Sequence, residues 1–223
     1  VYDFRAADIA LGGQGAPLVP TADAALIGRS TSWKAIINLG GIASMTLLPP
    51  KNGPDKHHPI MGWDCGPANS LIDLAIFEFS KGEQCFDQDG NFASRGRPHL
   101  PTIQQWLKEP YFQLKPPKST GREEFGRKDL KKRLKTISTF NYPDQIATIT
   151  SFSAAIIAKD LSMLKVLPRD LIVSGGGSKN LFLMQSIKQN CKGTTVSSIN
   201  EIGIPAERRE ALSFALFAWW NYL

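Results

Sequence analysis

Residues 34–48 read Lys-Ala-Ile-Ile-Asn-Leu-Gly-Gly-Ile-Ala-Ser-Met-Thr-Leu-Leu, and this stretch decides the fold. Residues 34–38 are mostly apolar and bounded by a turn signal, which predicts a buried strand, and a second strand is predicted over residues 42–48. Glycine readily adopts backbone angles that other residues avoid. We therefore expect Gly40-Gly41 to form the corner of a β-hairpin.

A second glycine corner follows another apolar run nearer the end of the chain. Residues 171–174 predict a short strand, and the next six residues are Gly-Gly-Gly-Ser-Lys-Asn, ending at Asn180, a suitable N-cap for a following helix. Backbone N–H groups at such corners, together with a helix N-terminus, suit phosphate groups. For either corner alone a plain tight turn is the simpler interpretation, and neither matches a Walker or GxGxxG motif.

Helical patterns lie between and after these strands. Apolar residues at steps of three and four predict helices, and capping residues and prolines mark their ends. The expected helices cover residues 69–81, 102–108, from Asn141-Tyr142-Pro143 to Pro168, from Asn180 onwards, and from about Glu207 to the end, with a further strand over residues 194–198. Strands mixed with helices along the chain predict an α/β layered fold.

A carboxylate precedes a glycine-rich loop near the front of the chain. Residues 8–20 read Asp-Ile-Ala-Leu-Gly-Gly-Gln-Gly-Ala-Pro-Leu-Val-Pro. The glycines let a ligand approach the main chain, and the prolines stiffen the exit from the loop. Asp8 is thus a candidate general base or acceptor for a sugar hydroxyl. The alternative interpretation is a structural turn in which Asp8 acts as a cap.

The net charge of +6 comes from one stretch, residues 115–135, which holds nine Lys or Arg and three Asp or Glu. Because Phe125 is its only aromatic residue, a solvated helix face is favoured over a nucleic-acid site. The part near Lys118 and Arg122 remains a candidate for an anionic ligand. No apolar run reaches membrane-spanning length, so no membrane partner is expected. The three cysteines and three histidines have no metal-ligand spacing, and the odd cysteine count favours a reducing compartment.

Six segments together resemble the anhydro-N-acetylmuramic acid kinase family. The resemblance covers nearly the whole chain in the family's order, and the segment starting at Asp8 is the most specific. The other segments read Asn-Leu-Gly-Gly-Ile-Ala-Ser at 38–44, Gly-Trp-Asp-Cys-Gly-Pro-Ala-Asn at 62–69, Ser-Thr-Gly-Arg-Glu-Glu-Phe at 119–125, Ser-Gly-Gly-Gly-Ser-Lys-Asn at 174–180 and Glu-Ala-Leu-Ser-Phe-Ala at 210–215.

The resemblance implies the fold of the sugar kinase, actin and heat-shock ATPase superfamily, an α/β actin-like ATPase (ribonuclease-H-like) domain with a mixed sheet flanked by helices. It implies that residues 1–30 end a first domain and that residues 31–223 form a second one. It also implies a cytoplasmic enzyme of cell-wall amino-sugar recycling. Such an enzyme opens 1,6-anhydro-N-acetylmuramic acid with water and phosphorylates it from ATP, with Mg²⁺, to N-acetylmuramic acid 6-phosphate.

The resemblance also assigns roles to residues. By motif position Asp8 is the base that activates the attacking water. The nucleotide-binding residues implied by the motifs are Asn38, Gly40, Gly41, Gly175, Gly176 and Gly177. The substrate-binding residues are Gln14, Asp64, Arg122 and Glu123, although a solvated, salt-bridged surface explains Arg122 and Glu123 equally well.

Some features depart from the family pattern. The family opens with a Gly-Thr-Ser-x-Asp-Gly-type phosphate loop that these residues lack, so the first domain of the same enzyme is an expected partner, and a homodimer is left open. Ser44, Cys65 and Ala68 stand where the family usually has Asn, Thr and Gly. Two alternatives remain: a non-catalytic remnant that binds sugar or nucleotide, and another sugar kinase of the superfamily.

Overall fold

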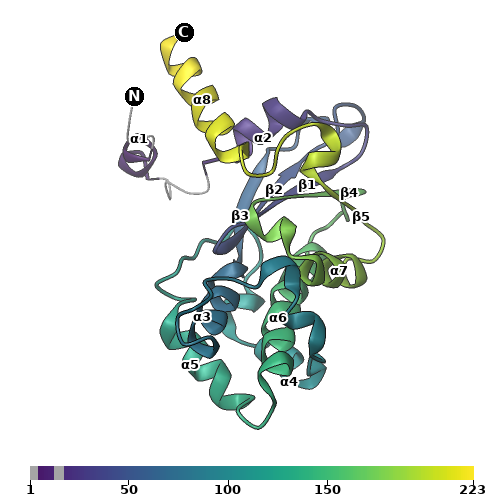
Figure 1. The fold of residues 1–223 in the computed structure, drawn as a ribbon. Helices are drawn as coiled ribbons and strands as arrows, with labels where there is room; N and C mark the ends of the chain where they lie inside the picture. Colours follow the sequence, from purple (N-terminus) through teal and green to yellow (C-terminus); the bar gives the residue numbers. More distant parts are fainter. Residues whose placement is uncertain (1–4, 13–17) are drawn as a thin grey trace.

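The computed structural model describes residues 5–12 and 18–223, which build a five-stranded sheet with helices on both faces (Figure 1). The order of the strands across the sheet is β3-β2-β1-β4-β5. The bounds of the strands are β1 Lys34–Leu39, β2 Ile42–Leu48, β3 Met61–Pro67, β4 Asp170–Ser174 and β5 Thr195–Ser198.

The sheet is mixed, as the resemblance implies. Strands β1 and β2 pair antiparallel as the predicted hairpin, and β3 continues that meander with a bulge between Ala43 and Ser44. Strands β1, β4 and β5 are parallel, and Asn38 on β1 is level with Ser174 on β4. Because parallel strands end at the same edge of a sheet, the two glycine corners lie side by side there.

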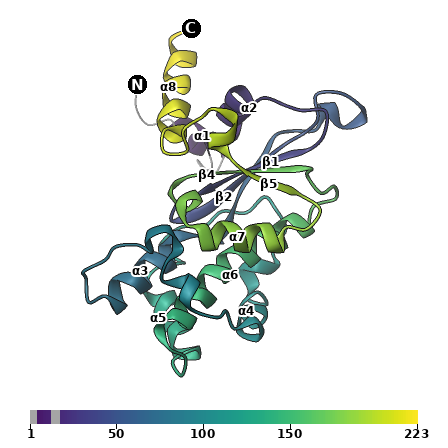
Figure 2. The same cartoon turned by 45° about the vertical axis from the view of Figure 1, so that its right-hand side comes forward.

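Helices cover the sheet unequally. The larger core lies on the face covered by α6 and α7, whereas α2 and α8 cover the other face, as Figure 2 shows. A helical layer made by α3, α4 and α5 extends from α6 away from the sheet (Figure 1). The bounds of the helices are α1 Ala6–Ala10, α2 Pro20–Ile27, α3 Asn69–Phe79, α4 Leu100–Trp106, α5 Arg127–Thr136, α6 Tyr142–Ser162, α7 Leu181–Asn190 and α8 Arg209–Tyr222. Short 3₁₀ turns are η1 Pro54–His57, η2 Gln88–Gly90, η3 Ala93–Arg95, η4 Pro110–Gln113, η5 Gly176–Lys179 and η6 Ile199–Ile202.

Helix starts were predicted better than helix ends. The Asn141 side chain accepts a hydrogen bond from the Asp144 N–H at 2.9 Å, and the Asn180 side chain accepts one from the Leu183 N–H at 2.9 Å, so both predicted caps are confirmed. The expected end of α6 at Pro168 is wrong, because the helix ends at Ser162. The chain needs the intervening residues to turn back toward β4, and a residue before proline disfavours the helical conformation.

The interpretation of residues 115–135 as a solvated face is wrong for two of the basic residues. Arg133 on α5 is completely buried, where its guanidinium donates to Asp129 Oδ2 at 2.8 Å and to Glu109 Oε2 at 2.9 Å. Lys118 is also buried, and its partner is Asp160. A buried cation is tolerated where carboxylates neutralise it, and the sequence spacing does not show those partners.

Helix α8 is fastened to the sheet through one buried carboxylate. The Arg209 guanidinium donates to both carboxylate oxygens of Asp23 on α2, and Thr46 on β2 donates to Asp23 Oδ2 at 2.7 Å. Burial raises the pKa of Asp23, and Arg209 offsets part of that effect. Within the part of the chain that the structure describes, no helix is at once long enough and apolar enough to cross a lipid bilayer.

Candidate functional site

The two glycine corners meet at the carboxyl ends of β1 and β4. The Asn38 side chain lies between them, because a Cβ atom added to Gly175 would be 2.6 Å from Asn38 Oδ1. Gly175 has a φ of +83°, which favours glycine. A Cβ atom added to Gly177 would lie 2.7 Å from the Leu39 Cβ, so these two glycines are required by close packing between the corners.

Gly176 differs from its two neighbours. A Cβ atom at Gly176 would meet no described atom within 4 Å, and the residue is exposed. Nothing in the packing of the described residues therefore requires glycine at this position. A glycine in open space leaves the backbone accessible to a ligand, and this is the arrangement that a nucleotide needs at such a loop.

The hairpin corner also caps α3. The Asn69 N–H donates to the Gly40 carbonyl at 3.0 Å, and the Ser70 N–H donates to the Gly41 carbonyl at 3.0 Å. The Asn69 side chain in turn donates to the Leu39 carbonyl at 2.9 Å. The corner carbonyls thus point toward the helix and satisfy its first N–H groups, which holds the corner rigidly beside α3.

A cavity of about 340 Å³, here called the glycine cavity, opens beside these corners. It is lined mainly by polar side chains and by the open glycine. Its lining residues are Asn69, Asp73, Phe86, Asp87, Gln88, Asp89, Gly176, Gly177, Lys179 and Asn180. Lys179 forms an ion pair with Glu207 at the rim, and both side chains are mostly exposed. The size is in the range of small-ligand pockets, about 300 to 1,000 Å³.

Asp64 on β3 is buried and fully hydrogen-bonded within the chain. Its carboxylate accepts from Ser44 Oγ at 2.6 Å, from Ser119 Oγ at 3.2 Å and from the Thr120 N–H at 3.2 Å. Ser44, one of the expected departures from the family pattern, therefore donates a hydrogen bond to this carboxylate. These hydrogen bonds join β2 and β3 to the loop of residues 119–125, which contains Arg122.

A buried ion pair lies behind Asp64. Lys118 Nζ donates to Asp160 Oδ1 on α6 at 2.8 Å, and Trp63 Nε1 donates to Asp160 Oδ2 at 2.9 Å. The Lys118 carbonyl also accepts from the Asp64 N–H at 2.9 Å. The expectation that Lys118 serves an anionic ligand is wrong, because its ammonium group is buried against Asp160. The pair instead holds both chain segments that flank Asp64.

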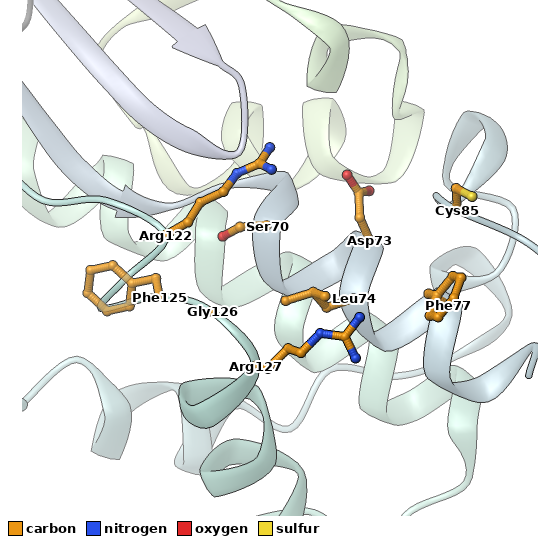
Figure 3. Close-up of a pocket in the computed structure, with 9 residues that line it drawn as sticks. All are labelled: Ser70, Asp73, Leu74, Phe77, Cys85, Arg122, Phe125, Gly126 and Arg127. Atoms are coloured by element: carbon orange, nitrogen blue, oxygen red, sulfur yellow. The ribbon is translucent and has the colours of Figure 1, made fainter. Parts of the chain in front are cut away.

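Arg122 and Glu123 lie on the exposed loop before α5. The Arg122 guanidinium rests on the hairpin corner, since a Cβ atom added to Gly41 would lie 2.7 Å from its Nε and Nη2 atoms. Figure 3 shows Arg122 and Asp73 on opposite sides of a second cavity. Burial raises the pKa of Asp73 from its ordinary 3.8 to about 6, and the charge of Arg122 offsets part of that rise. Glu123 turns back toward Gly121.

The remaining candidate residues lie at the front of the chain. Asp8 falls within the backbone of α1, and Gln14 lies outside the described residues. The structure therefore brings together Asn38 and both glycine corners, with Arg122 beside one of them. Among residues 5–12 and 18–223, no three His, Cys, Asp or Glu side chains are close enough to hold a metal ion.

Sequence reasoning missed several residues of the glycine cavity. Asp73 carries the clearest signal, because it is a carboxylate inside the otherwise apolar run of α3. Asp87 and Asp89 stand in an Asp-Gln-Asp-Gly stretch that is typical of a turn, so the sequence gives no sign of a cavity wall there. The Asp87 carboxylate accepts from the N–H groups of Phe92 at 2.7 Å and Ala93 at 3.0 Å, so it stabilises the loop that forms one wall.

Comparison with known proteins relates the whole chain to one family. The family model described as anhydro-N-acetylmuramic acid kinase matches residues 1–222. A protein of that name from Prochlorococcus marinus (strain MIT 9303) is 57% identical over 227 residues, covering 100% of this chain and 60% of the relative. Another from Synechococcus sp. (strain CC9311) is 56% identical and covers 100% of this chain and 59% of the relative. The chain thus spans about 60% of the length of these curated relatives.

A solved structure supports the predicted fold. The activator of the 2-hydroxyisocaproyl-CoA dehydratase from Clostridium difficile, with bound ADPNP, aligns with a TM-score of 0.51 over 84% of this chain and 60% of its own. The two sequences are 14% identical, so this likeness concerns the fold alone. It confirms the predicted α/β actin-like ATPase architecture, with a mixed sheet flanked by helices.

Proposed function

The chain belongs to the anhydro-N-acetylmuramic acid kinase family, and from this membership we propose that the protein acts as an ATP-dependent sugar kinase. The reaction opens 1,6-anhydro-N-acetylmuramic acid with water and yields N-acetylmuramic acid 6-phosphate. The observation that carries the proposal is the meeting of the two glycine corners beside the glycine cavity, with Gly176 open. Such a corner at the carboxyl ends of parallel strands is suited to a nucleotide.

The proposed nucleotide site uses the residues at this edge of the sheet. The Gly40–Gly41 corner lies on the phosphate side and the Gly175–Gly177 corner on the adenosine side. Asn38 keeps the two corners at a fixed separation, since its side chain contacts the second corner. The rigid cap that the hairpin forms on α3 supports this geometry, because phosphoryl transfer depends on fixed positions around the phosphates.

The proposed sugar site involves Asp8, Gln14, Arg122, Glu123 and Asp64. Asp8 takes the proton of the attacking water while the bond from that water oxygen to the anomeric carbon forms. The bond from the anomeric carbon to O6 breaks, and O6 attacks the γ-phosphorus as ADP leaves. Arg122 supplies positive charge beside the hairpin corner. Asp64 acts by holding the loop that carries Arg122, because its carboxylate is bonded to Ser119 and Thr120.

Mg²⁺ fits this proposal as a companion of ATP. Magnesium in such sites is held by substrate phosphates, water and one or two carboxylates, and it neutralises phosphate charge. Asp73 and Asp89 provide carboxylates on the wall of the glycine cavity. These two carboxylates are the side-chain oxygen ligands that the cavity wall would offer to an ion that arrives with the nucleotide.

Further properties of the family are proposed for the whole protein. These are a cytoplasmic location, a role in amino-sugar recycling, and a division in which residues 1–30 end a first domain and residues 31–223 form a second. Contact with that first domain, or with a second copy, is supported by the exposed aromatic side chains of Trp219, Trp220 and Tyr222 on α8.

The test measures ADP release with anhydro-N-acetylmuramic acid in a protein of the relatives' full length. We expect turnover, and we expect Asp8→Asn to lower kcat by at least about 100-fold, since a general base contributes roughly 10²–10⁴-fold. Anhydro-N-acetylglucosamine and ordinary hexoses serve as comparison substrates. Near-normal turnover of Asp8→Asn would show that Asp8 is not the general base. If the protein binds nucleotide but turns over none of the sugars, a non-catalytic binding protein is favoured.

A further inference from the structure

A second cavity of about 400 Å³ lies between α3 and the start of α5, beside the hairpin corner at Gly41. We call it the α3–α5 cavity. It combines apolar walls with arginine side chains, as Figure 3 shows. Its lining residues are Ser70, Asp73, Leu74, Phe77, Cys85, Arg122, Phe125, Gly126 and Arg127. Arg122 and Phe125 belong to the family segment 119–125, whereas the proposed kinase reaction gives no role to Ser70, Phe77 or Arg127.

Ser70 is the most informative residue of the wall. Only 5% of Ser70 is exposed. Its Oγ atom is buried and has no hydrogen-bond partner among the described residues. A buried hydroxyl without a partner destabilises a fold, and native structures rarely keep one. A hydroxyl of this kind on a cavity wall is explained if a ligand supplies its missing partner.

The charges around the cavity favour an anion. The guanidinium groups of Arg122 and Arg127 extend along two of its sides (Figure 3). Arg127 begins α5, whose N-cap residue Gly126 forms no side-chain cap, so the positive end of the helix faces the same space. Asp73 is the one carboxylate in the lining, and its charge is opposed by two cations.

The apolar walls restrict the kind of anion. Leu74, Phe77 and Phe125 line the cavity together with the charged groups. A hydrated inorganic ion would leave these side chains without a partner, whereas a ligand with an apolar body covers them. Guanidinium groups bind carboxylates and phosphates through paired hydrogen bonds.

We propose that the α3–α5 cavity is a further binding site, which adjoins the nucleotide and sugar sites and shares Arg122 with the sugar site, for a small organic anion with an apolar body. Its carboxylate or phosphate ester group binds Arg127, Arg122 and the hydroxyl of Ser70. The apolar body packs against Phe77 and Phe125. Because Asp73 lines both this cavity and the glycine cavity, the site adjoins the nucleotide site without sharing its glycine corners. The proposal does not depend on the kinase reaction.

The test uses calorimetric titration of the 223-residue protein with three matched probes: phenyl phosphate, phenylacetate and benzyl alcohol. We expect the anions to bind and the neutral alcohol not to bind, and the tighter anion identifies the preferred group. Ser70→Ala and Arg127→Gln should each weaken binding by about tenfold, the effect of losing one charge-assisted contact. Lys128→Gln is the matched control, because it removes a neighbouring positive charge that does not line the cavity.

Two further measurements locate the probe. Cys85 lines the cavity and is exposed, whereas Cys65 and Cys191 are buried, so a bound probe should slow alkylation of Cys85. Binding should also persist when ADP is saturating. Ser70→Ala should keep the thermal midpoint or raise it, because the hydroxyl it removes has no partner among the described residues.

Several results would overturn the proposal. These are equal binding of benzyl alcohol, unchanged affinity in both Ser70→Ala and Arg127→Gln, an equal loss in Lys128→Gln, or no binding of any probe. Displacement of the anion by ADP would instead make the cavity part of the nucleotide site. Arg127 is exposed, so its variant stays informative even if Ser70→Ala fails to fold.

Discussion

At the scale of single residues, adjacent glycines serve different purposes. Gly175 is required by its positive φ and Gly177 by its contact with Leu39, whereas Gly176 meets nothing within 4 Å among the described atoms. The sequence Gly-Gly-Gly does not distinguish them. Only Gly176 can therefore be changed to separate ligand access from folding.

We expect Gly176→Val to weaken ADP binding at least about tenfold while the thermal midpoint stays close to that of the parent, since the new side chain projects into open space. Gly177→Val is the matched control, and its Cβ would press on Leu39 and destabilise the fold. Calorimetric titration and thermal unfolding measure the two effects. If folded Gly176→Val binds ADP with unchanged affinity, the corner is a structural turn that does not contact the nucleotide.

Asp73 gives a prediction for the pH dependence of stability. The pKa of Asp73 is about 6 in the folded protein and near 3.8 without burial. Between these two pH values the Asp73 carboxyl group is protonated in the folded protein and ionised in the unfolded chain. The contribution of Asp73 to the free energy of unfolding is therefore greatest below pH 3.8 and is lost as pH rises to about 6.

Urea unfolding from pH 4 to 7 tests this sign. We expect the parent to lose about 1–2 kcal/mol across the interval relative to Asp73→Asn, because Arg122 and water screen part of the full effect. Glu78→Gln, an exposed change on the same helix, should follow the parent. Parallel curves for the parent and Asp73→Asn would mean that burial does not perturb this carboxyl group.

At the scale of elements, the contacts of one buried ion pair join strand β3, helix α6 and the loop at Lys118. Lys118 and Asp160 are 42 residues apart, and Asp160 also accepts a hydrogen bond from Trp63. The loop that leads to Arg122 begins at Lys118, whose carbonyl accepts from the N–H of Asp64. The position of the loop therefore depends on contacts deep in the core rather than on the loop itself.

Lys118→Met should lower the free energy of unfolding by about 3–5 kcal/mol, because it leaves the Asp160 carboxylate buried without its cation. Adding Asp160→Asn should restore most of the loss, since the amide removes the charge and still accepts from Trp63. Urea unfolding of both variants gives the comparison. If the double variant is no more stable than Lys118→Met, packing of the lysine chain rather than its charge stabilises this region.

At the scale of the whole molecule, the chain spans about 60% of its curated relatives. It contains the five-stranded sheet, both glycine corners and the cavities beside them. Catalysis of phosphoryl transfer depends on groups positioned all around the phosphates and on exclusion of water. The glycine corners supply such groups from one side.

We therefore expect the 223-residue chain to bind ADP. With ATP and anhydro-N-acetylmuramic acid as substrates, we expect it to form ADP far more slowly than a protein of the relatives' length. Coupled assays of ADP release on both proteins, at equal nucleotide saturation, make the comparison. Comparable rates would show that the described site is sufficient for turnover.

The sequence by itself determined the local features of this protein. The β1–β2 hairpin and the caps Asn141 and Asn180 were predicted correctly, because backbone sterics and hydrogen bonds between near neighbours decide them. Strand β3 was missed, since Gly62 and Gly66 interrupt its apolar pattern and most of the strand is buried without alternation. The two glycine corners were located from their motifs, and their role as a nucleotide site stays a prediction.

Only the tertiary structure decided which distant segments meet. The register of Asn38 with Ser174 brings the glycine corners together across more than half the chain, and Lys118 finds Asp160 rather than a ligand. The α3–α5 cavity likewise exists only because two helices separated in sequence pack side by side. Such pairings depend on the free energy of burying the whole core, in which each side chain's environment is set by partners far along the chain, and no local pattern contains that information.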